Sequence, residues 1–121
     1  MDADCYCDYD PPEFYSKRTP VAAKEHRCEE CGKLIRCGEM YEYVAAKWPE
    51  YSYFDVYKTC VRCCDLRQWV LNNVPCFCWY HHAMLDNAVE AIDEACWRAP
   101  DETKGLRFGF WRRMHAVHNS K

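Results

Sequence analysis

Two pairs of cysteines share one spacing and are separated by twenty-eight residues, Cys28/Cys31 and Cys60/Cys63. A two-residue spacer lets both sulfurs of a pair reach one metal ion from a single tight turn. Gly32 suits such a turn because glycine tolerates positive φ. Four thiolates at about 2.3 Å from one Zn²⁺ would make a closed tetrahedral structural site. Cysteines spaced in this way can also form a redox pair or part of a disulfide framework. The choice among these three roles therefore depends on other features of the sequence.

The cysteine content of the chain favours metal over disulfides. Eleven of the 121 residues are cysteine, a level at which a covalent or metal constraint is expected, and the odd number does not fit a fully paired framework. The N-terminus lacks the basic region and apolar run of a signal peptide, and no stretch approaches the roughly 18 apolar residues of a membrane span. We therefore expect a soluble, cytoplasmic protein, in a compartment where disulfides are disfavoured.

The periodicity of apolar residues predicts two strands and three helices. Residues 39–48 alternate with period two and are rich in tyrosine and valine, which is typical of a strand, and residues 51–59 are its predicted hairpin partner. Residues 60–73 are predicted to form a helix that ends before Pro75. Residues 80–97 have the spacing of an amphipathic helix, with Leu85, Val89, Ile92 and Cys96 on its apolar face. A last helix is predicted from residue 105 to about 118, with a basic outer face.

These elements predict an α+β fold: a small zinc-stapled domain of zinc knuckle, β-hairpin and helix, followed by two further α-helices. Half of the residues are hydrophobic, so a chain of this length can build a modest core. We expect a single domain over residues 1–121. It would comprise an acidic, cysteine-bearing tail (1–13), a zinc module (26–73) and a helical C-terminal part (80–118).

The order of turn, hairpin and helix with cysteine pairs at both ends resembles the treble-clef zinc finger over residues 26–73. The resemblance implies that one structural zinc is held by Cys28, Cys31, Cys60 and Cys63. A thioredoxin-like redox pair would need its Cys-x-x-Cys after a strand in a βαβ context, which the predicted elements lack. His26 precedes the first pair, and we expect a surface or hydrogen-bonding histidine there because four cysteines already complete the site.

Two further cysteine pairs have a one-residue spacer and are predicted to hold a second zinc. That site would pin the acidic tail against the 74–79 connector, with His81 or His82 as a substitute ligand; its four cysteines are Cys5, Cys7, Cys76 and Cys78. The alternative is that these cysteines are free thiols. Among the remaining cysteines, Cys96 is expected to be a small core residue.

Aromatic rings and charges define the candidate surfaces. The hairpin carries tyrosines at alternating positions, whose outward face is either a stacking platform or cover over a small core; we expect cover. The predicted partner-binding residues form an acidic set on the 80–97 helix and a basic set on the last helix: Asp86, Glu90, Asp93, Glu94, Arg107, Arg112 and Arg113. The basic set could instead neutralise the acidic helix within the fold, and such asymmetry can also be ordinary solvation.

Three functions compete for this chain. The first is a binding module that occupies a macromolecular partner, with a protein favoured over nucleic acid. The second is an HNH-like nuclease, whose chemistry needs a histidine at the strand end and a metal-binding set on the helix; here the hairpin offers Asp55 and the helix only Asn72 and Asn73. The third is a nucleic-acid-binding zinc finger that uses the basic last helix, but the acidic neighbouring helix would repel phosphate. We expect the binder, without enzymatic activity, membrane association or small-molecule substrate.

In the general character of its sequence, the chain also resembles small zinc-finger proteins encoded by bacteriophages and prophages. The resemblance rests on "HRCEECGKLIRCGEMY", "KTCVRCCDLRQWV" and "PCFCW". It implies a bacterial host cytoplasm. By analogy with small acidic phage proteins, it also implies stoichiometric inhibition of a host defence complex such as a CRISPR effector.

Overall fold

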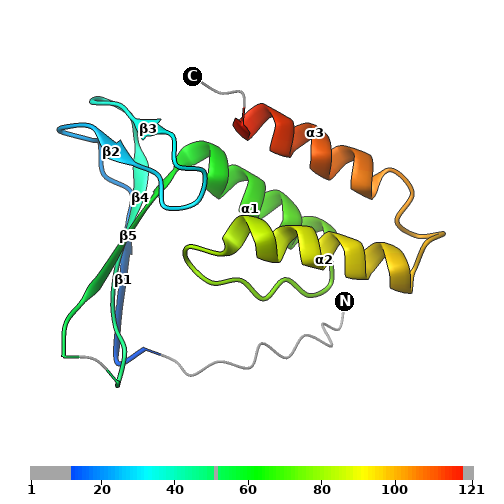
Figure 1. Ribbon diagram of the computed structural model, residues 1–121, viewed down its shortest axis with the longest axis horizontal. Helices are drawn as coiled ribbons and strands as arrows, with labels where there is room; N and C mark the ends of the chain where they lie inside the picture. The colour runs from blue at the N-terminus through cyan, green and yellow to red at the C-terminus, as the bar shows by residue number, and fades with distance from the viewer. Residues whose placement is uncertain (1–11, 51, 119–121) are drawn as a thin grey trace. The chain divides into compact units, whose positions relative to one another are not determined.

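The computed structural model describes residues 12–50 and 52–118. Within these residues it contains five strands and three helices (Figure 1). The strands are β1 (Phe14–Arg18), β2 (His26–Arg27), β3 (Leu34–Ile35), β4 (Tyr41–Lys47) and β5 (Asp55–Cys60). The helices are α1 (Val61–Asn73), α2 (Met84–Arg98) and α3 (Leu106–His118). The predicted α+β class is therefore confirmed, and the predicted helices are matched to within a few residues.

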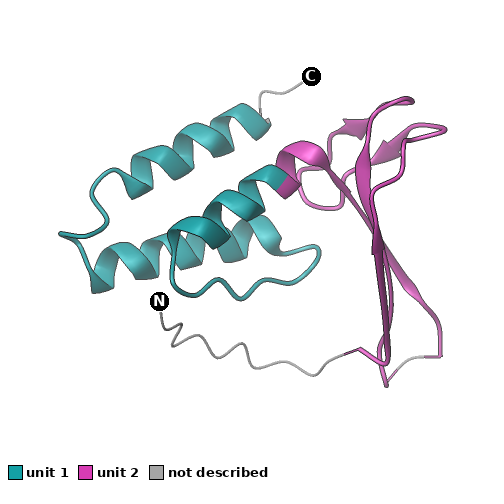
Figure 2. Cartoon of the chain, turned by 180° about the vertical axis from the view of Figure 1, so that it is seen from behind, with its two compact units in different colours: residues 1–7, 65–121 teal, residues 8–64 magenta. Residues whose placement is uncertain are grey.

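The chain divides into two compact units, whose boundary falls inside α1 between Cys64 and Asp65 (Figure 2). One unit contains the strands and the first turn of α1, and the other contains the rest of α1 with α2 and α3. The predicted single-domain organisation stays a prediction.

The strand-bearing unit is built on an antiparallel sheet in the order β1-β4-β5. The predicted hairpin is present as β4 and β5, with Val44 opposite Tyr57. Side chains on one face of this pair are buried, and Val44, Ala46 and Tyr57 form a core cluster against which Trp48 packs. Met40, directly before β4, is exposed.

Strand β1 is not among the two strands predicted from the sequence. It pairs with β4 along its whole length, from Phe14 opposite Lys47 to Arg18 opposite Tyr43. Glu13 extends the pairing, because its amide donates to the carbonyl of Lys47 at 2.7 Å. All five residues of β1 are exposed, so this strand widens the sheet without adding to the buried core.

The helical unit is held together by apolar faces and by aromatic contacts. Figure 1 shows α2 and α3 running in opposite directions, joined by residues 99–105. Phe110, Met114 and Val117 are buried on α3, whereas Leu106 is only half-buried. Gly109 lies against α1, since a Cβ on it would meet the Trp69 ring at 3.1 Å, and the Arg113 guanidinium covers that ring at 4.5 Å.

The buried face of α2 differs from the predicted one. Ile92 is buried as expected, but the other buried residues are Met84, Ala88 and Ala95, while Leu85, Val89 and Cys96 are only half-buried. The face is thus rotated by about one residue toward the alanines. Small side chains allow a neighbouring backbone to approach closely, so the larger apolar residues lie at the flanks.

None of the three described helices combines the length and the apolar character that a membrane span requires.

Phe110→Ala should destabilise the helical unit strongly. The Phe110 ring is fully buried, and removing a ring of this kind from a core costs about 3–5 kcal/mol. The matched control is Phe108→Ala on the same helix, since Phe108 is 73% exposed. Thermal and urea unfolding of both variants measures the difference. Equal stabilities would contradict the assignment of Phe110 to the core.

Candidate metal centre

The first cysteine pair lies in a tight turn between β2 and β3. These two-residue strands pair in antiparallel register, with Arg27 opposite Leu34. The turn is closed by two backbone hydrogen bonds, from the Cys28 amide to the Lys33 carbonyl (2.9 Å) and from the Gly32 amide to the Cys28 carbonyl (3.0 Å). Gly32 has a φ of +75°, which a side chain would disfavour. The turn therefore has the glycine-dependent shape expected from the sequence.

The second pair lies where β5 passes into α1. Cys60 is the last residue of β5, opposite Tyr41, and Cys63 lies in the first turn of α1. The turn of the first pair is attached to this strand by a hydrogen bond from the Glu29 amide to the Lys58 carbonyl (2.8 Å). The two cysteine pairs are distant in sequence, but the β4–β5 hairpin brings the end of β5 back beside the turn of the first pair.

The four sulfurs of Cys28, Cys31, Cys60 and Cys63 all lie within 4.8 Å of one another. The Cys28–Cys63 and Cys31–Cys60 sulfur distances are both 3.8 Å. A tetrahedron with metal–sulfur bonds of about 2.3 Å has edges of about 3.8 Å, so these distances fit the site of one zinc ion. The group is the one cluster of metal-binding side chains among the described residues. The predicted first site is therefore confirmed as an arrangement for zinc.

Burial and hydrogen bonding prepare the sulfurs for a cation. Cys28, Cys60 and Cys63 are buried and Cys31 is half-buried. The amides of Glu30 and Cys60 both donate to the Cys28 sulfur at 3.4 Å. Such donors stabilise a thiolate without occupying the place of the metal. Sequence spacing gave no signal for them, because they depend on the folded path of the turn.

The four thiols also perturb one another. Hydrogen bonds within the cluster, first from Cys31, lower the pKa of Cys28, whereas the hydrogen bond with Cys28 is the first cause that raises the pKa of Cys63. Because four thiolates repel one another at these distances, the cluster without a cation keeps protons. A divalent metal displaces those protons and makes all four sulfurs ligands. All four positions come from the protein, which is the pattern of a structural zinc site.

His26 lies beside the centre and outside the group of ligands. Its Nδ1 atom is 3.3 Å from the Lys58 ammonium, and its ring packs at 5.1 Å against the ring of Tyr41. Desolvation, and then the charges of Lys58 and Lys24, lower the pKa of His26. The expected hydrogen-bonding role is confirmed. Tyr41 and Tyr57 are buried, so these two rings are the expected cover.

The structure describes half of the predicted second site. The sulfurs of Cys76 and Cys78 are 3.7 Å apart, close to the tetrahedral edge, while Cys5 and Cys7 lie outside the described residues. Neither Cys76 nor Cys78 is a free thiol in the structure, and their separation excludes a bond between the two. The second site therefore stays a prediction.

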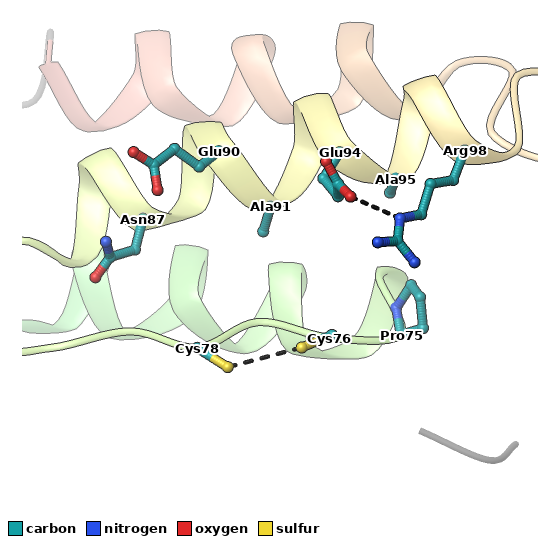
Figure 3. A pocket seen from close by; sticks show the side chains of 9 residues that line it. All are labelled: Pro75, Cys76, Cys78, Asn87, Glu90, Ala91, Glu94, Ala95 and Arg98. Atoms are coloured by element: carbon teal, nitrogen blue, oxygen red, sulfur yellow. Dashed lines mark hydrogen bonds and ion pairs between the residues drawn. The ribbon is translucent and has the colours of Figure 1, made fainter. Parts of the chain in front are cut away.

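The sulfurs of Cys76 and Cys78 line a pocket of about 480 Å³ beside α2 (Figure 3). Glu94 in this pocket is paired with Arg98 at 2.6 Å. The proposed substitute ligands, His81 and His82, belong to no metal-binding group among the described residues. The His81 ring instead packs edge-on against Trp79 at 5.0 Å.

The predicted acidic and basic sets are partly paired with each other. Asp93 accepts a hydrogen bond from Arg107, which links α2 to α3. Arg113 covers Trp69, and Arg112 is exposed. For Arg107, the neutralising role considered from the sequence is therefore observed. Its cause is the antiparallel packing of two helices that the sequence alone does not place side by side.

Cys60→Ser should remove the zinc and unfold the strand-bearing unit. A structural zinc site supplies about 10–16 kcal/mol of apparent binding energy in peptides, comparable with the whole stability of a domain. The matched control is Cys37→Ser, because Cys37 is exposed and outside the cluster. Elemental analysis and circular dichroism measure the outcome. If wild-type protein that is purified without chelator contains no zinc, the assignment of this site to zinc is wrong.

Deletion of residues 1–8 should lower the zinc content from two ions per chain to one. The deletion removes two of the four predicted ligands, while Cys76 and Cys78 alone leave the coordination of a second ion incomplete. Zinc analysis should be combined with thiol titration of the unfolded protein. A different result would contradict the second zinc site. If the full chain binds one zinc and the titration finds four thiols fewer than the sequence contains, these cysteines form disulfides instead.

Comparisons with protein-family models, curated proteins and solved structures find no match to this chain. The case for a zinc protein therefore rests on the residues themselves, on the four converging sulfurs and the hydrogen bonds around them.

Proposed function

We propose that this chain is a zinc-stapled protein that acts by stoichiometric binding to a protein partner through its charged helices. The supporting observation is the Cys28–Cys31–Cys60–Cys63 group, in which the protein itself supplies all four zinc ligands. A metal held in this way leaves no open position for a substrate and contributes stability. The zinc is then a staple, and the function belongs to the surfaces that it supports.

The outer face of α2 is the candidate surface. Asp86, Glu90, Asp93 and Glu94 are all exposed, on the side of the helix away from the buried residues. Asp93 and Glu94 have partners on Arg107 and Arg98. Asp86 and Glu90 have no ion-pair partner among the described residues, so their charge is available to another molecule. Carboxylates arranged in this way complement a basic groove and raise the rate of association.

A phosphate-reading protein of a host defence system, such as a CRISPR effector, has a groove of the required charge. The candidate function is therefore that of a phage-encoded inhibitor in the bacterial cytoplasm, in line with the resemblance of the sequence to small phage zinc-finger proteins. The inhibitor would occupy the groove by charge and shape without chemical change.

Charge reversal of the unpaired carboxylates tests this proposal. Asp86→Lys combined with Glu90→Lys should slow association with a purified effector by about tenfold or more, because complementary charge steers the encounter. The matched control is Asp101→Lys with Glu102→Lys, which reverses two exposed carboxylates outside α2. Binding is measured by surface plasmon resonance, and function by phage plaques on CRISPR-carrying cells.

Two results would contradict the proposal. Full-strength association of the α2 variant, with zinc content and fold intact, would make the acidic face ordinary solvated surface. Cleavage of DNA or RNA by the wild type with added Mg²⁺ or Mn²⁺ would replace the binder with the nuclease considered from the sequence.

A further inference from the structure

The solvent-facing side of the β1-β4-β5 sheet combines exposed aromatic rings with positive charges. Residues paired across an antiparallel sheet share a face, which places Phe14 with Lys47, and Arg18 with Tyr43 and Lys58. Phe54 joins this face because its ring meets that of Phe14 edge-on at 5.4 Å. We call these six residues the aromatic–basic face: Phe14, Arg18, Tyr43, Lys47, Phe54 and Lys58.

The rings at one end of this face are unusually exposed for apolar side chains. Phe14 is 49% exposed and Phe54 is 53% exposed, although each could have been a polar residue at no cost to the core. At the other end, the Arg18 guanidinium lies 4.6 Å from the centre of the Tyr43 ring. Flat groups are thus presented at both ends, about 14 Å apart along the strands.

Small side chains separate the two ends. Ser16, Ala45 and Val56 occupy the row between them, because they are paired with one another across the three strands. A row of short side chains leaves a shallow floor between the rings and the guanidinium. A flat ligand segment can lie across it without meeting a ridge.

The charges on this side are all positive within the three strands. Arg18, Lys47 and Lys58 point to it, whereas Glu42 and Asp55 alternate onto the opposite face of the sheet. One carboxylate competes at the margin, since Glu13 is 2.5 Å from the Lys47 ammonium. Lys58 also faces His26, whose nitrogen accepts its hydrogen bond. The acidic residues of α2 belong to the other unit and do not belong to this face.

We propose that the aromatic–basic face binds single-stranded nucleic acid. Bases of any sequence stack on exposed rings and on guanidinium planes, while phosphates are neutralised by the flanking cations. A duplex keeps its bases stacked inside, so it cannot use the rings. An acidic peptide would use the cations but gains no stacking from the phenylalanines. This activity belongs to a different surface from the proposed protein-binding helices and does not depend on them.

The proposal is tested with the full-length, zinc-loaded chain and fluorescein-labelled oligothymidylate and oligouridylate of about 12 nucleotides. Fluorescence anisotropy should give a dissociation constant of about 1–100 µM at physiological salt, and weaker binding to a duplex of equal length. Phe14→Ala with Phe54→Ala should weaken single-strand binding about fivefold or more. The matched control is Phe108→Ala, an exposed ring on α3 that should leave binding unchanged.

A second pair of variants tests the charges. Log affinity falls as log salt rises, and each phosphate contact contributes about 0.7 to the steepness of that fall. Arg18→Glu with Lys58→Glu should therefore make the fall shallower by about 1.4. Lys104→Glu with Arg112→Glu reverses two exposed charges of the helical unit and should leave the slope unchanged. Zinc content and melting temperature verify that each variant is folded.

Several outcomes would overturn the proposal. These are the absence of binding up to about 1 mM protein, equal affinity for duplex, or unchanged affinity in the phenylalanine variant. Loss of binding in the Lys104/Arg112 variant alone would move the contact to the helical unit. Binding of poly-glutamate with the same affinity as the oligonucleotides, unchanged in the phenylalanine variant, would show that the face takes acidic polypeptides instead.

Discussion

The repulsion among four thiolates, and its relief by one divalent ion, is the constraint on which the strand-bearing unit depends. The Cys28–Cys31 turn rests on two strands of two residues each, which are too short to be stable alone. A metal shared by its sulfurs with Cys60 and Cys63 would fix the turn to the sheet and to α1. Hydrogen bonds from the Glu30 and Cys60 amides to the Cys28 sulfur join the same parts of the chain. We therefore expect metal binding and folding of this unit to be coupled.

The same centre fixes the faces of the sheet. Cys60 is both a member of the cysteine group and the last residue of β5, so a bound metal would hold its pairing with Tyr41. A slip of one residue would turn Val44 and Tyr57 out of the core and bring the outward residues in. By holding this register, a bound zinc would keep the apolar cluster buried and Phe14, Tyr43 and Lys58 on the outward face. The metal thus acts on the surface through the sheet.

The helical unit uses different interactions. Its core is apolar, with Phe110 and Ile92 fully buried, and its surface charges are partly compensated by Arg107 with Asp93 and Arg98 with Glu94. Exposed pairs of this kind contribute little to stability, so their main effect is on the field that a partner meets. What remains uncompensated, Asp86 and Glu90, concentrates negative charge on one stretch of α2. The chain therefore carries an acidic surface in one unit and a basic, aromatic surface in the other.

The sequence by itself determined the zinc ligands, the hairpin and the three helices. Thiol chemistry and the two-residue spacer need only a few neighbouring residues, and apolar periodicity is a local property of each element. Pairing across the chain was decided only by the tertiary structure. The sequence indicated neither that β1 joins β4 nor that Tyr41 turns inward against His26. The burial of Ala88 and Ala95 in place of Val89 and Cys96 was equally hidden. Each of these depends on which side chains or backbone segments approach from a distant part of the chain, and local patterns carry no information about that approach.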